Sequence, residues 1–207
     1  MSNHCFNLSL FEAAQYATSL PPMVLVKPVK IEKGYVFDDI SPAFDAPSLD
    51  RDKRRWAASS RHVSFGYGEF DFITAPCAPG DVAVLRERWR WVRLSVDRDG
   101  EEWGIRYLVD KQLAKVDQRL VHHPLNLSDL GPQHMPAVFA RHHRPVVSVN
   151  PSLVREVPWQ YWFDAGFRSG GARLGEAEDL GREEWVRHYG ERYPWDTSWA
   201  WVIGLGE

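Results

Sequence analysis

The sequence predicts an α+β protein built on a small mixed or antiparallel β-barrel, with a few short helices packed at its ends. Two observations favour this class. About seven strand-like runs, rich in Val, Ile, Phe and Trp, are separated by turns of Gly, Pro and Asp. The helical segments are short and do not alternate with the strands, so the parallel sheet of an α/β protein is not expected. The 207 residues fit one domain with decorations or two small domains.

The strand-like runs are spread over the chain. They cover residues 23–26, 35–37, 70–73, 82–94, 103–109, 146–149 and 199–205. The dipeptide Asp99-Gly100 is typical of a β-hairpin turn and joins two of these runs. Residues 38–68 show little periodicity, and we expect an irregular segment there.

Three short helices are expected outside the strands. The capping box Ser9-Leu-Phe-Glu12 predicts the first, which reaches about residue 18. Pro158 stands in the first-turn position that proline favours and begins a second, which ends at Gly166. An acidic first turn predicts a third helix, from residue 176 or 180 to residue 189.

The run 82–94 is the most informative strand, because it follows the turn sequence Pro79-Gly80-Asp81 and has two unlike faces. One face carries Val82, Val84, Arg86, Arg88, Arg90 and Val92, and the other carries Ala83, Leu85, Glu87, Trp89 and Trp91. The three arginines share a side that we expect to face water or an anion. Glu87 lies on the apolar side, where a carboxylate is either paired with a cation or has a raised pKa.

A basic cluster precedes an aromatic residue within the irregular segment. It consists of Arg51, Lys53, Arg54 and Arg55, followed by Trp56. Basic residues beside an aromatic ring are typical of sites that bind phosphates and stack a base. The alternative is a solvated loop neutralised by Asp50 and Asp52. The net charge of −3 argues against a strongly basic nucleic-acid binder but allows a local basic patch.

Cysteine usage and hydropathy indicate a cytoplasmic protein without a membrane partner. Cys5 and Cys77 have neither a metal-binding spacing nor a disulfide framework, as in a reducing compartment. No apolar run reaches the ~18 residues of a membrane span, and no signal peptide is evident. Histidines cluster between residues 122 and 143, but no carboxylate or cysteine completes a metal motif. Glycine-rich phosphate loops and hydrolase motifs are also absent from the sequence, so we expect no metal and no cofactor.

Four segments, in order, resemble the ASCH-domain proteins of phages and prophages, which belong to the PUA-like superfamily of small β-barrels. They are Cys77-Ala-Pro-Gly-Asp81 with Leu85-Arg-Glu-Arg-Trp89, then His134-Met-Pro136, then residues 157–167 with Asp164-Ala-Gly166, and finally Trp185, Trp195-Asp196 and Trp199-Ala-Trp-Val-Ile203. The resemblance covers about residues 75–203. It implies a single domain, with a barrel over about 69–205 and a divergent N-terminal extension over 1–68 that adds part of the barrel. It also implies a nucleic-acid-related role, in a host cytoplasm if the protein is phage encoded.

The chain departs from this family before the Pro-Gly-Asp turn. The family has Gly-Arg-Lys-Thr-x-Thr-Arg-Arg there, and relatives that hydrolyse N4-acetylcytidine use its lysine and threonine with a glutamate from the strand after Gly-Asp. The nearest match is Arg51-Asp-Lys-Arg-Arg-Trp56, so that Lys53 and Glu87 stand for the lysine and the glutamate. The threonine nucleophile is missing unless Ser59 or Ser60 replaces it, and a Lys–Glu pair alone cannot form an acyl intermediate.

Three functional hypotheses follow from the residues and the resemblance. The first is a nucleic-acid-binding module for RNA or a modified base, with a phosphate surface and a base pocket. The surface comprises Arg51, Lys53, Arg54, Arg55, Trp56, Arg86, Arg88 and Arg90, and the pocket comprises Glu87, Trp89 and His134. The second is an amidohydrolase or nuclease that acts on a modified nucleoside or RNA, with Lys53 and Glu87 as its catalytic acid–base pair. The third is a phage accessory protein whose Trp-rich surface binds a host protein.

Overall fold

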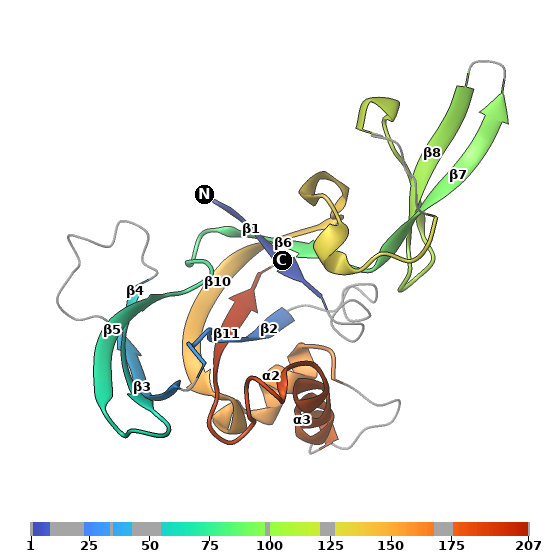
Figure 1. Ribbon diagram of the computed structural model, residues 1–207. Helices are drawn as coiled ribbons and strands as arrows, with labels where there is room; N and C mark the ends of the chain where they lie inside the picture. The colour runs from blue at the N-terminus through green and yellow to red at the C-terminus, as the bar shows by residue number, and fades with distance from the viewer. Residues whose placement is uncertain are drawn as a thin grey trace. The chain divides into compact units, whose positions relative to one another are not determined.

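The fold is described from a computed structural model of the chain (Figure 1). The structure describes residues 2–8, 23–33, 35–42, 55–97, 100–120, 127–167 and 176–206. Within these ranges most of the secondary structure is strand, arranged in three sheets and accompanied by two α-helices. The predicted mixture of strands and short helices is confirmed. The described strands form separate sheets, and no closed barrel is found among them.

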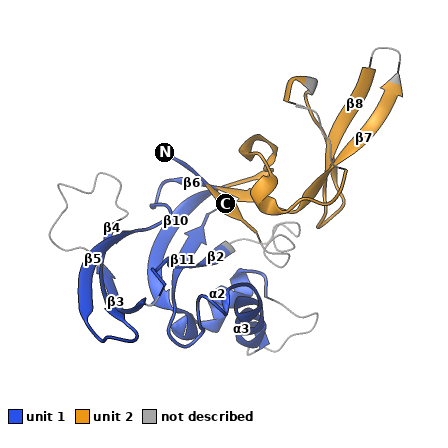
Figure 2. Ribbon diagram, viewed as in Figure 1, with its two compact units in different colours: residues 1–4, 20–83, 144–207 blue, residues 5–19, 84–143 orange. Residues whose placement is uncertain are grey.

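The chain divides into two compact units (Figure 2). Unit 1 comprises residues 1–4, 20–83 and 144–207, and unit 2 comprises residues 5–19 and 84–143. Boundaries fall inside strands β1 (Asn3–Asn7), β6 (Val82–Arg86) and β10 (His142–Leu153), which therefore carry the chain from one unit to the other.

A five-stranded sheet has the order β1-β6-β10-β11-β2. Its remaining strands are β1 (Asn3–Asn7), β11 (Trp199–Leu205) and β2 (Met23–Pro28). Strand β11 pairs antiparallel with both neighbours, with Ile203 opposite Val149 on β10 and opposite Leu25 on β2. Ile203 and Leu25 are both completely buried, so this pairing lies in the core of unit 1. The predicted strands at 23–26, 146–149 and 199–205 are confirmed, and the first two are longer than expected.

A three-stranded sheet, also in unit 1, consists of β3 (Tyr35–Pro42), β4 (Arg55–His62) and β5 (Gly68–Thr74) in that order. Its inner face is buried through Ile40 and Ala58, and Trp56 packs edge-on against Trp201 of β11. Strand β4 lies in the segment 38–68 that the sequence predicts to be irregular, and that prediction is wrong for residues 38–42 and 55–62, which are strand. Small residues give β4 no hydrophobic alternation, and its conformation is held by antiparallel pairing on both sides.

Two α-helices lie between β10 and β11 in the chain, α2 (Trp159–Asp164) and α3 (Glu176–Tyr189). Both were expected from the sequence and are confirmed. Trp162 of α2 and Trp185 of α3 are buried, and the Trp185 indole N–H donates a hydrogen bond to the Tyr193 carbonyl at 2.7 Å. The helix expected after Ser9 lies outside the described residues. None of the helices described is long and apolar enough to cross a bilayer.

Unit 2 contains a hairpin of β7 (Trp89–Asp97) and β8 (Gly100–Tyr107), extended by the short strand β9 (Leu113–Lys115). This confirms the predicted hairpin, whereas Asp99 of its turn lies outside the described residues. Short 3-10 helices lie in the connections of both units, at Gln118–Leu120, Pro132–His134, Ala137–Phe139 and Val154–Glu156. The core of unit 2 forms around Trp89, Ile105 and Met135.

The prediction of one continuous strand over residues 82–94 is wrong. The run divides at Glu87 and Arg88 into β6, in the five-stranded sheet, and β7, in the hairpin sheet. On the far side of the break the Trp89 backbone exchanges hydrogen bonds with Leu130, at 3.1 and 2.7 Å. Ala83, Leu85, Glu87 and Trp89 are all buried, as the predicted face requires, but Val84 on the other face is buried as well, and the backbone changes partners within the run. The hydrophobic pattern of a sequence does not show where a strand passes from one sheet to another.

Candidate functional site

The predicted basic cluster lies mostly outside the described residues. Arg51, Lys53 and Arg54 are outside them, and only the backbone of Arg55, the first residue of β4, is described. Trp56 is half-buried, with its ring centroid 5.8 Å from that of Trp201. This packing holds one face of Trp56 in the protein interior, and phosphate binding by the cluster stays a prediction.

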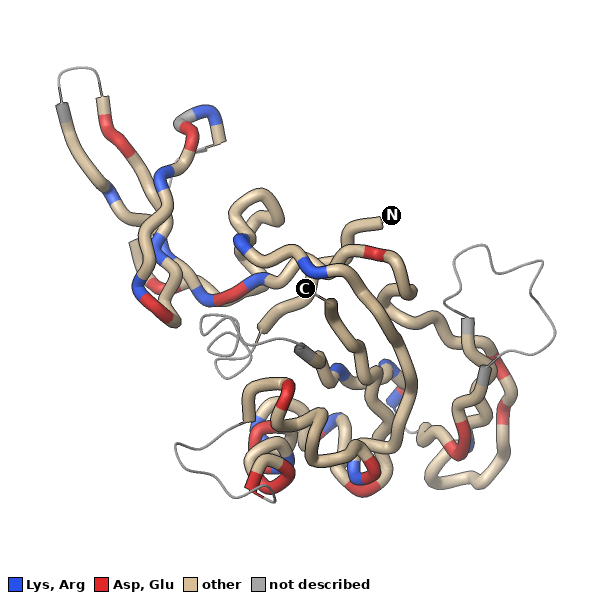
Figure 3. The backbone as a smooth tube through the Cα atoms, turned by 180° about the vertical axis from the view of Figure 1, so that it is seen from behind, with Lys and Arg blue, Asp and Glu red and all other residues tan. Residues whose placement is uncertain are grey.

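The three arginines of the predicted face have different surroundings. Arg86 is half-buried and directs Nη1 to the Met135 carbonyl at 3.5 Å, Arg88 is exposed, and Arg90 lies 3.7 Å from the Asp129 carboxylate. Basic and acidic residues are interspersed along the described parts of the chain (Figure 3). The break between β6 and β7 removes the shared face that a continuous strand would have given these arginines.

Glu87 is buried in unit 2, where it is bound by an arginine that the sequence did not single out. The residue is 1% exposed. Arg141 donates from Nε to Glu87 Oε1 at 2.8 Å and from Nη2 to Glu87 Oε2 at 3.0 Å. Two parallel N–H···O bonds of this kind are the strongest pairing between a guanidinium and a carboxylate.

Arg141 is the centre of a larger polar cluster. Its Nη1 donates to Asp110 and to Gln112, each at 2.7 Å, and its guanidinium carbon lies 4.2 Å from the ring centroid of Tyr107. Tyr107 is itself held by a hydrogen bond of 2.8 Å from its hydroxyl to the Phe139 carbonyl. One arginine thereby satisfies two carboxylates and stacks on an aromatic ring, so its position is fixed on several sides.

The cluster sets the protonation of its members. Burial raises the pKa of the Glu87 carboxyl above its usual value, and the hydrogen bonds and charge of Arg141 offset only part of this effect. Burial also acts to raise the pKa of Asp110, but the hydrogen bonds from Arg141 and the Gln112 backbone lower it overall. A carboxylate held by a bidentate arginine inside the core has no free edge for a substrate, so this geometry does not favour Glu87 as a general base.

The other predicted pocket residues do not join Glu87 at an accessible surface. Trp89 is 2% exposed and belongs to the core of unit 2, whereas His134 is exposed. Of the three side chains, only His134 is open to a ligand in the described structure.

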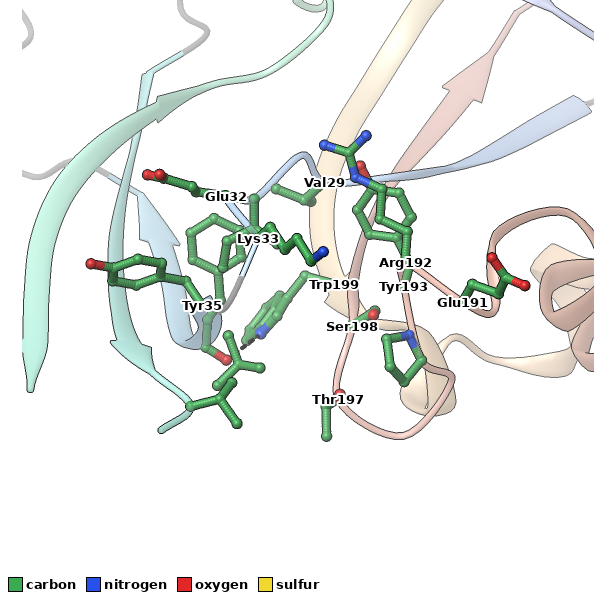
Figure 4. A pocket seen from close by; sticks show the side chains of 15 residues that line it. Val29, Glu32, Lys33, Tyr35, Glu191, Arg192, Tyr193, Thr197, Ser198 and Trp199 are labelled. Carbon is green, nitrogen blue, oxygen red and sulfur yellow. Dashed lines mark hydrogen bonds between the residues drawn. The ribbon is translucent and has the colours of Figure 1, made fainter. Parts of the chain in front are cut away.

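A cavity of about 640 Å³ lies in unit 1, where the sequence did not predict one (Figure 4). Its lining comes from the segment between β2 and β3, the start of β3, the β4–β5 turn and the segment before β11. These residues are Val29, Ile31, Glu32, Lys33, Tyr35, Val36, Phe37, Val63, Glu191, Arg192, Tyr193, Pro194, Thr197, Ser198 and Trp199. The volume falls within the range of about 300–1,000 Å³ that is usual for small-molecule sites.

Aromatic rings and two cations give the cavity its chemistry. Trp199 and Phe37 are half-buried, and the Trp199 indole N–H donates to the Phe37 carbonyl at 3.3 Å, which fixes the orientation of the indole. Lys33 and Arg192 are exposed at the rim, and neither forms an ion pair within the described part of the chain. The Arg192 guanidinium lies 5.5 Å from the ring centroid of Tyr193.

Exposed aromatic rings stand beside this cavity on the turn between β4 and β5. Phe65 and Tyr67 are 73% and 50% exposed, with ring planes 11° apart and centroids 6.1 Å apart. The His62 ring stacks on Tyr67 at 5.5 Å and lies 4.7 Å from Phe65. Tyr35, a cavity residue, meets His62 edge-on at 5.0 Å. We call His62, Phe65 and Tyr67 the aromatic platform.

Neither the cavity nor the platform was predicted from the sequence. The platform has a weak signal in retrospect, since Val63-Ser-Phe-Gly-Tyr67 carries two aromatic residues in a turn, where no core requires them. Among the residues that the structure describes, no group of three or more His, Cys, Asp and Glu side chains is arranged to hold a metal ion. Comparison with family models, curated proteins and solved structures found no match to the chain.

Proposed function

We propose that the protein binds single-stranded nucleic acid, RNA in the first instance, through the aromatic platform. The observation that carries the proposal is a pair of stacked rings, Phe65 and Tyr67, that remain largely exposed on a turn. Contiguous exposed apolar patches often mark interaction sites. Bases stack on such rings with little regard to sequence, because every base has a π-face.

The surroundings of the platform support strand binding. Lys33 and Arg192 place two cations at the rim of the neighbouring cavity, whose lining includes Tyr35 of β3 and Val63 of the β4–β5 turn. Cations beside stacking rings provide the phosphate contacts that supply much of the affinity for single strands. In sequence, the basic cluster Arg51 to Arg55 leads directly into β4, the strand that ends at His62.

The ASCH-type classification forms part of this proposal. It rests on the four sequence segments in family order and on a mainly β fold, and a closed PUA-like barrel is its finer structural claim. An RNA-binding module of phage or prophage origin accords with it. The amidohydrolase alternative receives less support, because Arg141 binds the carboxylate that would serve as the base.

The test is a titration of a fluorescently labelled, unstructured RNA of about 12 nucleotides, a length within the range that such modules cover. Binding is followed by fluorescence anisotropy, first at about 50 mM salt and then at about 200 mM salt. The wild-type protein should bind at low salt and weaken steeply as salt rises, because phosphate contacts release counterions. Phe65→Ala should weaken binding roughly 5- to 150-fold, the effect of losing one base–ring stack.

Phe70→Ala is the matched control. Phe70 is 69% exposed on β5, close to the 73% of Phe65, and its ring partner is Phe72 rather than a platform residue. Its substitution should leave RNA binding unchanged. Absence of binding to any unstructured RNA or DNA at low salt refutes the proposed function, as does an equal loss in the two variants.

A further inference from the structure

We propose that the cavity in unit 1 is a site for a nucleotide that ends in a phosphate monoester, either free or at the 5′ end of a strand. The inference rests on the proposed function for the nature of the ligand, and it adds a second site with its own selectivity. Three features of the cavity carry it: an oriented aromatic wall, two rim cations without ion-pair partners in the described residues, and two carboxylates at the outer edges.

The aromatic wall fits the flat face of a base. Trp199 and Phe37 are only half-buried, so ring surface faces the cavity, and the hydrogen bond of 3.3 Å between them holds the indole in place. The hydroxyl groups of Thr197 and Ser198 lie in the same lining, where they can donate to or accept from a sugar or a base edge. A wall that is already oriented does not have to be ordered when the ligand binds.

The two rim cations fit a phosphate. Figure 4 shows Lys33 extending across the cavity, with Arg192 and Tyr193 on the opposite wall. The cation–π contact with Tyr193 keeps the guanidinium of Arg192 at this rim. Two cations from separate segments, residues 29–37 and 191–199, can contact one phosphate from two directions.

The carboxylates explain why the phosphate should be terminal. Glu32 and Glu191 also line the cavity, and Figure 4 shows their carboxylates pointing outward at opposite edges, away from Lys33. An internal nucleotide carries a phosphodiester on each side, and both would have to leave the cavity past this acidic rim. A nucleotide with a terminal phosphate monoester has at most one phosphodiester that must pass this rim. The monoester also bears a charge near −2 at neutral pH, which strengthens its attraction to Lys33 and Arg192.

The experiment compares two RNAs of the same unstructured sequence, one with a 5′-phosphate and one with a 5′-hydroxyl group, in the anisotropy assay. It also compares a nucleoside 5′-monophosphate with its nucleoside by isothermal titration calorimetry, which identifies the free form of the ligand. The 5′-phosphorylated RNA should bind at least about tenfold more tightly than the hydroxyl form, because a single charge-assisted hydrogen bond has about this effect or a larger one. The nucleotide should bind and the nucleoside should not.

Lys33→Gln should abolish the preference for the phosphorylated RNA and the binding of the nucleotide. Lys30→Gln is the matched control, because Lys30 is exposed three residues away and does not line the cavity. Phe65→Ala should weaken both RNAs equally, so loss of the platform and loss of the cavity are distinguishable. Equal affinity of the wild type for both RNAs, together with no binding of the nucleotide, overturns the inference and leaves the proposed function standing. A preference that survives Lys33→Gln combined with Arg192→Gln also overturns it.

Discussion

Replacement of Arg141 by methionine should destabilise the protein by about 3–5 kcal/mol at pH 8, because it leaves the Glu87 carboxylate buried without its cation. The structure sets this magnitude. Glu87 is 1% exposed and receives two charge-assisted hydrogen bonds from Arg141, each of which contributes about 1.5–3 kcal/mol in such settings. Asp110 loses a bond as well, but its side chain is 20% exposed and recovers part of that loss from water.

The penalty should depend on pH in a defined direction. The pKa of Glu87 is raised in the folded protein, so the folded state binds this proton more tightly than the unfolded chain, in which glutamate has a pKa of about 4.3. Stability therefore falls as the pH rises from the unfolded value through the folded value. Without Arg141 the pKa of Glu87 rises further, so most of the variant's loss of stability relative to the wild type should develop as the pH rises from about 4.5 to about 8.

Urea denaturation followed by far-UV circular dichroism, at both pH values, measures the effect. Arg90→Met is the matched control, because its partner Asp129 is 3.7 Å away and both side chains are substantially exposed, so the expected cost is about 0–1 kcal/mol. The double variant Arg141→Met/Glu87→Leu should recover much of the loss, since a hydrophobic pair can replace a buried ion pair. An Arg141→Met penalty no larger than that of the control, or one that is equal at both pH values, would refute this account.

Two further predictions concern unit 1. Gly181→Ala should lower the melting temperature, because the added Cβ meets the buried ring of Trp162 and overpacking costs about 1–3 kcal/mol. This cost exceeds the advantage of about 1 kcal/mol that alanine has over glycine in a helix. A higher melting temperature would contradict this packing. Asp81→Asn should remove stability near neutral pH but little in strong acid. Burial acts to raise the pKa of Asp81, but hydrogen bonds from the backbone N–H groups of Ser2 and Ala78 lower it overall, so its contribution is present above about pH 4 and is lost as the pH falls through the lowered value. Melting curves between neutral and acidic pH test this, and an unchanged pH profile in the variant would count against it.

Segments with strong local signals were predictable from the sequence. The last strand, Trp199–Leu205, has the predicted bounds because Trp, Val and Ile fill it and it is buried on both sides. Helix α3 was predictable from its acidic first turn, which complements the helix dipole. The turn at Pro79-Gly80 was predictable because Gly80 adopts φ = 92°, a conformation that glycine tolerates well.

The features that depend on distant partners were not predictable. The position of Glu87 in an apolar pattern indicated that it needs a cation, but nothing in the chain pointed to Arg141, 54 residues later, among 25 lysines and arginines. The cavity likewise forms only when residues 29–37, 63 and 191–199 come together. Lys33 and Arg192 are single charges in turns, and such residues carry no periodic signal that distinguishes a ligand-binding cation from a solvated one.

The outermost position of β5 has a consequence for handling the protein at high concentration. In the described part of the three-stranded sheet β5 has one neighbour, β4, and six of its seven residues are exposed, including Phe70 and Phe72. The unpaired backbone N–H and C=O groups of such an edge strand can pair with the same strand of another molecule, which would lead to aggregation. Here the Asp71 carboxylate accepts the Phe72 backbone N–H at 2.7 Å, so this donor is already occupied when another strand approaches. Two such strands would also bring the acidic side chains of Glu69 and Asp71 together, and their repulsion favours a monodisperse solution.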